Sequence, residues 1–269
     1  MKEKKKGILI SVLNNKGGVG KTCVSCNLGH ALTRQKKNVL VIDMDSQCNA
    51  TSLLLPPKTS INFSLYELLD PSSENLNIEK YIYQTQYENF DCIPNICETA
   101  GIEPDIIRTA PESFFCLKKK VRDYAIENYD FTIIDNPPNM GTFVITSLYS
   151  SDFVIVPNEI DSAFSLEGLL KAIQLIKDIQ QNGNKDLRFL RLLINKVDLR
   201  TSISRVAIQN IKRNFKPDQY FNTTIPINTA FKQAEQFKQT IFRYKSSAPG
   251  TKAYRKLATE LIEILSHEE

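Results

Sequence analysis

A glycine-rich segment with two lysines is the part of this sequence best suited to chemistry. Its residues are, in order, Asn15, Lys16, Gly17, Gly18, Val19, Gly20, Lys21 and Thr22. Glycines let backbone N–H groups turn inward around phosphate oxygens, and a helix that begins directly after the loop adds the positive end of its dipole. Lys21 would neutralise charge between the β- and γ-phosphates, while the Thr22 hydroxyl would bind Mg²⁺. The segment predicts an ATP-binding phosphate loop, with Cys23 as the next residue in contact with the nucleotide.

This loop departs from the ordinary pattern G-x-x-x-x-G-K-[ST] at its first position. Asn15 stands where that pattern has a glycine, and the additional lysine, Lys16, follows it. A β-prone run precedes the loop and an amphipathic stretch follows it, which is the context that a phosphate loop requires. A chance glycine turn is therefore a poor explanation of these eight residues.

Three aspartates at the ends of apolar runs complete the predicted site. Asp43 and Asp45 follow one run, and Asp135 closes another. Carboxylates at the carboxyl ends of parallel strands face the ligand crevice, next to the phosphate loop. We expect Asp45 to orient the attacking water, Asp43 to support the Mg²⁺ shell, and Asp135 to hold Mg²⁺ through water.

The elements that must position these residues alternate between apolar runs and helical patterns. The strand signals lie at 7–13, 38–43, 90–93, 131–135, 153–156 and 189–194, and the helical patterns at 22–35, 115–128, 166–181, 202–215 and 252–266. Strands that are apolar on both faces and alternate with helices indicate a parallel sheet covered on both sides. The predicted fold is α/β, a single P-loop NTPase domain over residues 1–269 with a mostly parallel twisted sheet and helices on both faces. No N-terminal helix-turn-helix extension is expected.

Composition is consistent with such a domain. The chain has 269 residues, of which 42% are apolar and 24% charged, so it can bury a full core. No apolar run approaches the roughly 18–20 residues that span a bilayer, so we expect a cytoplasmic protein without a membrane partner. Six irregularly spaced cysteines indicate reduced thiols. Cys23 and Cys26 have C-x-x-C spacing, but a half-buried helix face explains them better than a metal site does.

Charge is distributed unevenly along the chain. Residues 181–269 contain 16 Lys and Arg against 8 Asp and Glu, although the whole chain has a net charge of only +4. A basic C-terminal third indicates an anionic partner or a solvated helical surface, and charge alone does not separate the two.

The phosphate loop resembles that of a known group of ATPases. The letters K-G-G-V-G-K-T, which begin at Lys16, are similar to the deviant Walker A loop of the ParA/MinD superfamily. In that superfamily the first lysine reaches across a dimer interface to the ATP of the facing subunit. The resemblance therefore implies an ATP-dependent homodimer in which Lys16 acts in trans.

Further motifs narrow the resemblance to ParA/Soj chromosome and plasmid partition ATPases. The similar segments are 43–51, with Ser46 and Cys48 in place of a proline and a glycine, and then 129–138, 164–168, 198–201 and 246–254. The resemblance also places Asn195 and the Pro226 to Asn228 turn around the adenine. It implies nonspecific binding of double-stranded DNA in the ATP state, hydrolysis stimulated by a ParB-type partner, and association with the nucleoid. The candidate DNA contacts are Arg200, Arg205, Lys212, Arg213, Lys232 and Lys238.

Three alternatives stay open at this point. Two arginines of the family stretch I-P-R-N-V-R are replaced by Ile227 and Ala230, which leaves room for a ParA-like ATPase that positions a cargo other than DNA or regulates replication initiation. A MinD-like membrane ATPase would need a free amphipathic C-terminal helix, but the last helix ends in an acidic segment, so its apolar stripe is expected in the core. A protein like the nitrogenase iron protein would need cluster-binding cysteines, and none lies near Asp135.

Overall fold

A computed structural model describes residues 6–74, 76–159, 165–198 and 200–267. Its sheet has seven strands in the order β3-β4-β2-β5-β1-β6-β7. Every pair is parallel except β3 with β4. The strands are β1 (Ile8–Val12), β2 (Val39–Asp43), β3 (Tyr83–Gln84), β4 (Phe90–Ile93), β5 (Phe131–Asp135), β6 (Phe153–Glu159) and β7 (Arg188–Asn195).

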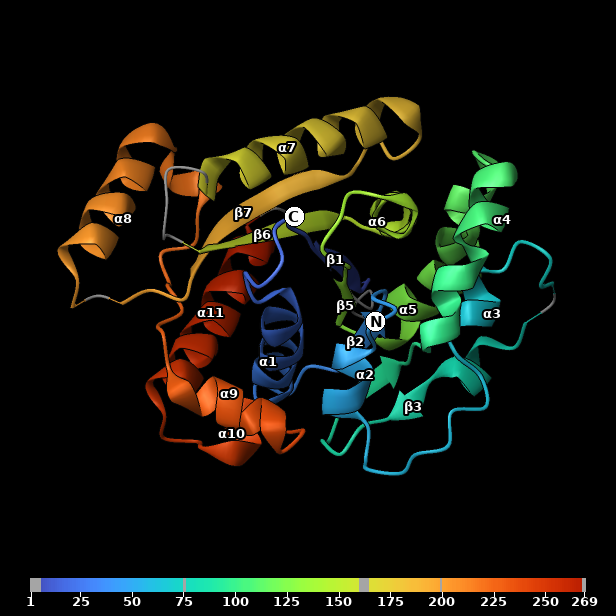
Figure 1. Cartoon of the computed structure of the whole chain (residues 1–269), viewed down its shortest axis with the longest axis horizontal. Helices are drawn as coiled ribbons and strands as arrows, with labels where there is room; N and C mark the ends of the chain where they lie inside the picture. Colours follow the sequence, from blue (N-terminus) through green and yellow to red (C-terminus); the bar gives the residue numbers. More distant parts are fainter. Residues whose placement is uncertain (1–5, 75, 160–164, 199, 268–269) are drawn as a thin grey trace, which may run out of the picture.

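Helices cover both faces of this sheet (Figure 1). One face packs against α1 (Lys21–Thr33), α2 (Asn49–Leu54), α10 (Ile241–Tyr244) and α11 (Pro249–Ser266). The other face packs against α3 (Leu65–Leu69), α4 (Glu103–Arg108), α5 (Asp123–Asn128), α6 (Thr142–Ser150), α7 (Ser165–Asn182) and α8 (Ser202–Asn214). A further helix, α9 (Thr229–Gln236), lies close to α10. The predicted α/β class with helices on both faces is confirmed.

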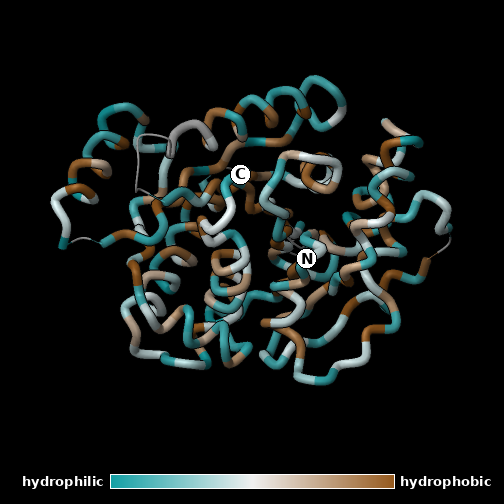
Figure 2. The backbone as a smooth tube through the Cα atoms, in the orientation of Figure 1, coloured by the Kyte–Doolittle hydropathy of each residue, from teal (hydrophilic) through white to brown (hydrophobic). Residues whose placement is uncertain are grey.

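The apolar character of the central strands follows from this layering. Successive residues of a strand point to opposite faces, so a strand covered on both sides is apolar throughout. In β1, Ile10 and Val12 join the core beneath α1 and α11, whereas Leu9 joins the core on the opposite face. Figure 2 shows hydrophilic and hydrophobic stretches alternating along α7 and α8, which are covered on one side only.

The last helix illustrates how burial resolves an ambiguous stripe. Ala253, Leu257, Leu261 and Leu265 are all buried against the core that also contains the α1 side chains. The expectation that this stripe belongs to the core is confirmed. No helix within the described ranges is both long and apolar enough to cross a membrane.

The structure adds a detail to the helix that the sequence predicts from 115 to 128. Residues 116–128 are helical without a break, but the turn at 118–122, just before α5, is a wider π-type turn, and a short 3-10 turn precedes the helix at 112–115. The buried residues Leu117, Val121 and Ala125 recur every four positions along this helix, and all three face the core under the sheet.

Candidate nucleotide-binding site

The predicted phosphate loop connects β1 to α1, and its shape depends on specific hydrogen bonds. The Asn14 side-chain oxygen accepts from the Lys16 N–H at 2.9 Å, and the Asn14 amide nitrogen donates to the Pro157 carbonyl at 2.8 Å. Gly18 and Gly20 adopt φ values of 78° and 89°, which favour glycine over other residues. The glycines therefore permit the turn that directs the loop into α1.

A second segment, at the end of β7, supports the loop from the side. The Asn195 amide nitrogen donates to the Val19 carbonyl at 2.7 Å, and its oxygen accepts from the Lys196 N–H at 3.0 Å. The Lys196 ammonium donates to the Gly18 carbonyl and forms an ion pair with Glu159 at 3.5 Å. Two loop carbonyls are thus tied to the ends of β6 and β7.

The two lysines of the loop have different environments. Lys21 is buried, and its ammonium lies 3.4 Å from the Lys16 carbonyl. Burial lowers the pKa of Lys21, while the nearby charges of Asp135 and Asp45 oppose that shift. The Lys16 side chain is exposed on the loop. Lys21 therefore lies inside the site, whereas Lys16 lies on its exposed side.

Asp135 is fully buried beside the start of α1. One carboxylate oxygen accepts from the Ser25 hydroxyl at 2.8 Å, and the Thr22 hydroxyl also donates to this carboxylate. The other oxygen has no hydrogen-bond partner among the described residues. Burial raises the pKa of Asp135, so the nearby hydrogen bonds and the charge of Lys21 do not fully compensate for the loss of solvation of its carboxylate.

This unsatisfied oxygen fits a hydrated Mg²⁺. Buried polar atoms are nearly always paired, and Mg²⁺ prefers a few protein oxygens together with water and phosphate oxygens. No group of three or more His, Cys, Asp or Glu side chains in the described part of the chain could hold a metal ion alone. Thr22 and Asp135 would thus hold the cation only together with a polyphosphate.

Asp43 and Asp45 lie at the same edge but make different contacts. The Asp43 carboxylate accepts from the Thr51 N–H at 2.8 Å, from the Thr51 hydroxyl at 2.7 Å and from the Asp45 N–H at 3.2 Å. Burial and the neighbouring Asp135 raise the pKa of Asp43, and the Thr51 bonds oppose the shift. Asp45 accepts from the Gln47 N–H at 3.0 Å and lines the open pocket. Asp43 thus fixes the loop that presents Asp45.

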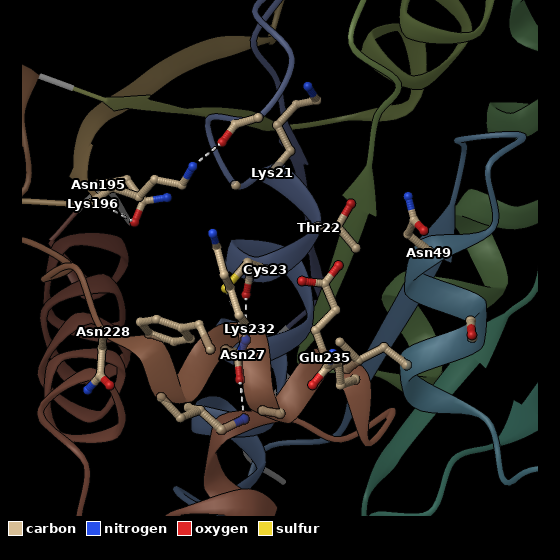
Figure 3. Close-up of a pocket in the computed structure, with 18 of the residues that line it drawn as sticks. Lys21, Thr22, Cys23, Asn27, Asn49, Asn195, Lys196, Asn228, Lys232 and Glu235 are labelled. Atoms are coloured by element: carbon tan, nitrogen blue, oxygen red, sulfur yellow. Dashed lines mark hydrogen bonds between the residues drawn. The ribbon is translucent and has the colours of Figure 1, made fainter. Parts of the chain in front are cut away.

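A pocket of about 800 Å³ joins these groups to α2 and α9 (Figure 3). Lys21, Thr22, Cys23 and Asp45 line it near the phosphate loop. Asn195, Pro226 and Asn228, the residues predicted around the adenine, line it as well. Helix α9 also contributes to the pocket, although the sequence patterns do not predict it, and its lining residues include Phe231 and Glu235. The helix could have been found from its N-cap, because Asn228 accepts from the Ala230 N–H at 2.9 Å.

The candidate DNA contacts do not form one group. Arg205, Lys212 and Arg213 are exposed on α8, whereas Lys232 and Lys238 line the pocket. Arg200 is exposed, but its guanidinium donates to Asp198 at 2.8 and 2.9 Å. Phe164 and Leu199, which take part in two of the motif matches, lie outside the described residues.

Comparison with known proteins agrees with this geometry. Residues 7–189 match the family described as AAA domain. The solved structure of cobyrinic acid a,c-diamide synthase from Mycobacterium smegmatis, with bound ADP and magnesium, is 25% identical and has a TM-score of 0.81, covering 98% of this chain and 97% of that chain. Fold and loop together define a P-loop nucleotide-binding protein.

Curated relatives identify the family within that class. Sporulation initiation inhibitor protein Soj of Bacillus subtilis is 33% identical over 255 residues, which are 95% of this chain and 98% of that protein. Chromosome partitioning protein ParA of Myxococcus xanthus is 29% identical over 95% of this chain and 88% of its own length. The chain belongs to the ParA/Soj family of partition ATPases.

The three loop glycines make different demands, which gives a graded prediction. A Cβ at Gly17 would meet nothing closer than 4.0 Å, one at Gly18 would have open space but a positive φ, and one at Gly20 would also lie 2.6 Å from the Asn195 amide nitrogen. We expect Gly17→Ala to be nearly neutral in unfolding free energy, Gly18→Ala to cost about 1–2 kcal/mol from strain, and Gly20→Ala to cost more. Denaturant unfolding of the three variants tests this order. Equal stabilities for Gly17→Ala and Gly20→Ala would contradict it.

Proposed function

We propose that this chain is an Mg²⁺-dependent, ATP-driven dimerising ATPase for plasmid or chromosome partitioning. The observation that supports it best is the buried, unpaired Asp135 oxygen beside Thr22 and Lys21, at the foot of a glycine loop. Mg²⁺ would supply the positive charge that the Asp135 carboxylate lacks, and a nucleoside triphosphate would supply the negative charge that suits Lys21 and the loop N–H groups.

Each part of the site then has a role. The N–H groups from Gly17 to Thr22 surround the phosphates, Lys21 neutralises the β- and γ-phosphates, and the Asn195 and Pro226–Asn228 segments border the base. Mg²⁺, held by Thr22 and through water by Asp135, would neutralise charge that develops on the phosphate oxygens. Asp43 supports this group by fixing the loop through Thr51.

Asp45 is the residue that we assign to the attacking water. Its carboxylate lines the pocket beside Lys21, and the Asp43 bond to its N–H sets the direction in which the side chain leaves the loop. A carboxylate in this position can accept a proton from water or orient it in line with the γ-phosphate. Hydrolysis is expected to be slow until a ParB-type partner binds.

Lys16 supports dimerisation in this proposal. Its N–H is bound to Asn14, so the main chain is fixed while the side chain stays exposed at the rim of the site. A lysine held there can reach the triphosphate of a facing subunit. The negative charge that attracts it would be present only when ATP is bound. Dimerisation is therefore linked to the nucleotide.

DNA binding is assigned to α8. Arg205, Lys212 and Arg213 are exposed there, and phosphate neutralisation by such residues gives sequence-independent affinity. One observation favours the second candidate, a ParA-like ATPase that positions a cargo other than DNA. Ile227, 58% exposed, occupies a position where the family stretch has arginine, so this surface carries less charge.

Hydrolysis and dimerisation can be separated by substituting Asp45 and Lys16. Asp45→Ala should retain ATP binding, lose hydrolysis by a factor of at least about 100 because the water is no longer oriented, and accumulate as an ATP-bound dimer. Lys16→Ala should bind ATP but remain monomeric. Phosphate release and size-exclusion chromatography with light scattering measure both. Normal hydrolysis by Asp45→Ala, or an ATP-dependent dimer of Lys16→Ala, would refute these assignments.

A separate prediction concerns DNA. With ATP, the Asp45→Ala dimer should bind unrelated duplexes, and replacing Arg205, Lys212 and Arg213 by alanine should weaken binding and reduce the salt slope by up to about 3 per subunit. The matched control replaces Lys245, Lys252 and Lys256, which are exposed on and before α11. Fluorescence anisotropy at several salt concentrations provides the measurement. No binding by the unmodified dimer would favour the non-DNA cargo instead.

A further inference from the structure

The pocket extends well beyond the phosphate loop, to a place where α9 supplies two charged side chains. Lys232 and Glu235 extend from α9 toward the start of α1 (Figure 3). They are three positions apart, so they share one face of the helix. Burial raises the pKa of Cys23 to about 11, and the charge of Glu235 adds to this shift, so the carboxylate lies near the residue that follows Thr22.

Three amide side chains around this part of the pocket are already engaged. Asn27 donates to the Cys23 carbonyl at 2.8 Å and accepts from the Ile241 N–H at 2.8 Å. Asn195 donates to the Val19 carbonyl and accepts from the Lys196 N–H, and the Asn228 oxygen caps α9. These hydrogen bonds hold the walls of the pocket in place.

Glu235 differs from these amides because its carboxylate has no protein partner among the described residues and is exposed in the pocket that it lines. It forms no ion pair with Lys232, although their spacing on one helix face would allow it. An ionised carboxylate accepts hydrogen bonds and donates none. The group that it would bind must therefore offer donors.

A nucleotide offers such donors at one place beyond its phosphates. If the phosphates lie in the glycine loop, the sugar would occupy the pocket beside Cys23, between the loop and the segments proposed to border the base. Its two adjacent hydroxyls are hydrogen-bond donors. A carboxylate has two oxygens that can accept from such a pair, as acidic residues do for ribose in dinucleotide-binding domains. Deoxyribose lacks one of these donors.

We propose that Glu235 is a specificity-determining residue whose carboxylate binds the ribose hydroxyls, so that the site selects ribonucleotides over deoxyribonucleotides; this inference rests on the nucleotide site proposed above. The adenine-facing segments at Asn195 and Pro226 cannot make this selection, because they border the base. In a cell that contains both kinds of triphosphate, the dimerisation switch would then respond to ATP and not to dATP.

Calorimetric titration of the full chain with three ligands tests the inference. ADP, 2′-deoxyADP and 3′-deoxyADP, each with Mg²⁺, would be titrated into the unmodified protein, Glu235→Gln, Glu235→Ala and the control Glu263→Ala, which removes an exposed glutamate from α11. The unmodified protein and Glu263→Ala should bind ADP at least about tenfold more tightly than either deoxynucleotide, the usual effect of a hydrogen bond to a charged group. Glu235→Ala should reduce the difference to less than about threefold, mainly by weakening ADP. Glu235→Gln should fall between, since an amide oxygen still accepts.

The outcomes separate this inference from the one on which it rests. If the unmodified protein binds no ADP, the nucleotide site itself is wrong, and the ribose assignment with it. If ADP binds, Lys21→Ala abolishes that binding, and 2′-deoxyADP binds as tightly as ADP, only the ribose assignment is wrong. Selection that persists in a folded Glu235→Ala, checked by circular dichroism, would also overturn it.

Discussion

Buried negative charge at the carboxyl edge of the sheet is the constraint around which this site is built. Parallel pairing of β2 with β5 places Asp43 opposite Asp135, and both are fully buried. Burial raises the pKa values of both carboxylates, and the charge of Asp135 raises the pKa of Asp43 further. Lys21 compensates part of this charge and is itself disfavoured by burial. In the proposed function, a cation with a bound polyphosphate would resolve the imbalance, which would link the sheet topology directly to the ligand.

The rest of the pocket is arranged to keep that edge in shape. Asn14, Asn195 and Lys196 hold the glycine loop through its backbone, and Asp43 fixes the following loop through Thr51. The polar atoms of these groups form hydrogen bonds within the protein, so a ligand would bind to a site that is already formed and has only a few unpaired polar groups. Preorganisation of this kind lowers the cost of ordering the site when the nucleotide binds.

Much of the site could be predicted from sequence because its signals are local. The glycines and lysines between Asn15 and Thr22 are consecutive, and Asp135 directly ends a buried strand, so one motif and one run of apolar residues locate them. The strands on both sides of β1 were equally clear, since residues apolar on both faces indicate a covered parallel sheet. The parts that depend on long-range packing were not visible. Helix α6 contains Val144, Ile145 and Thr146, β-branched residues with weak helix propensity, and its burial between sheet and neighbours decides its conformation.

The pocket wall on α9 was missed for a related reason. Nothing in the sequence marks Glu235 and Lys232 as pocket residues. They join the pocket only because the folded chain brings α9 close to the phosphate loop, from which it is far away in sequence. The candidate DNA contacts were grouped because they are all basic, but the structure separates them. Arg205 lies on α8, whereas Lys232 lines the pocket. Charge counts along a chain do not show which residues share a surface.

Thermal unfolding with Mg²⁺ alone, a nonhydrolysable ATP analogue alone and both together tests the central claim most directly. We expect Mg²⁺ and the analogue together to raise the melting temperature by clearly more than the sum of the shifts that each produces alone, because Thr22 and Asp135 would hold the cation only when phosphates complete its shell. Asp135→Asn should remove most of this excess. Equal stabilisation by the analogue with and without Mg²⁺, or an undiminished excess in Asp135→Asn, would contradict it.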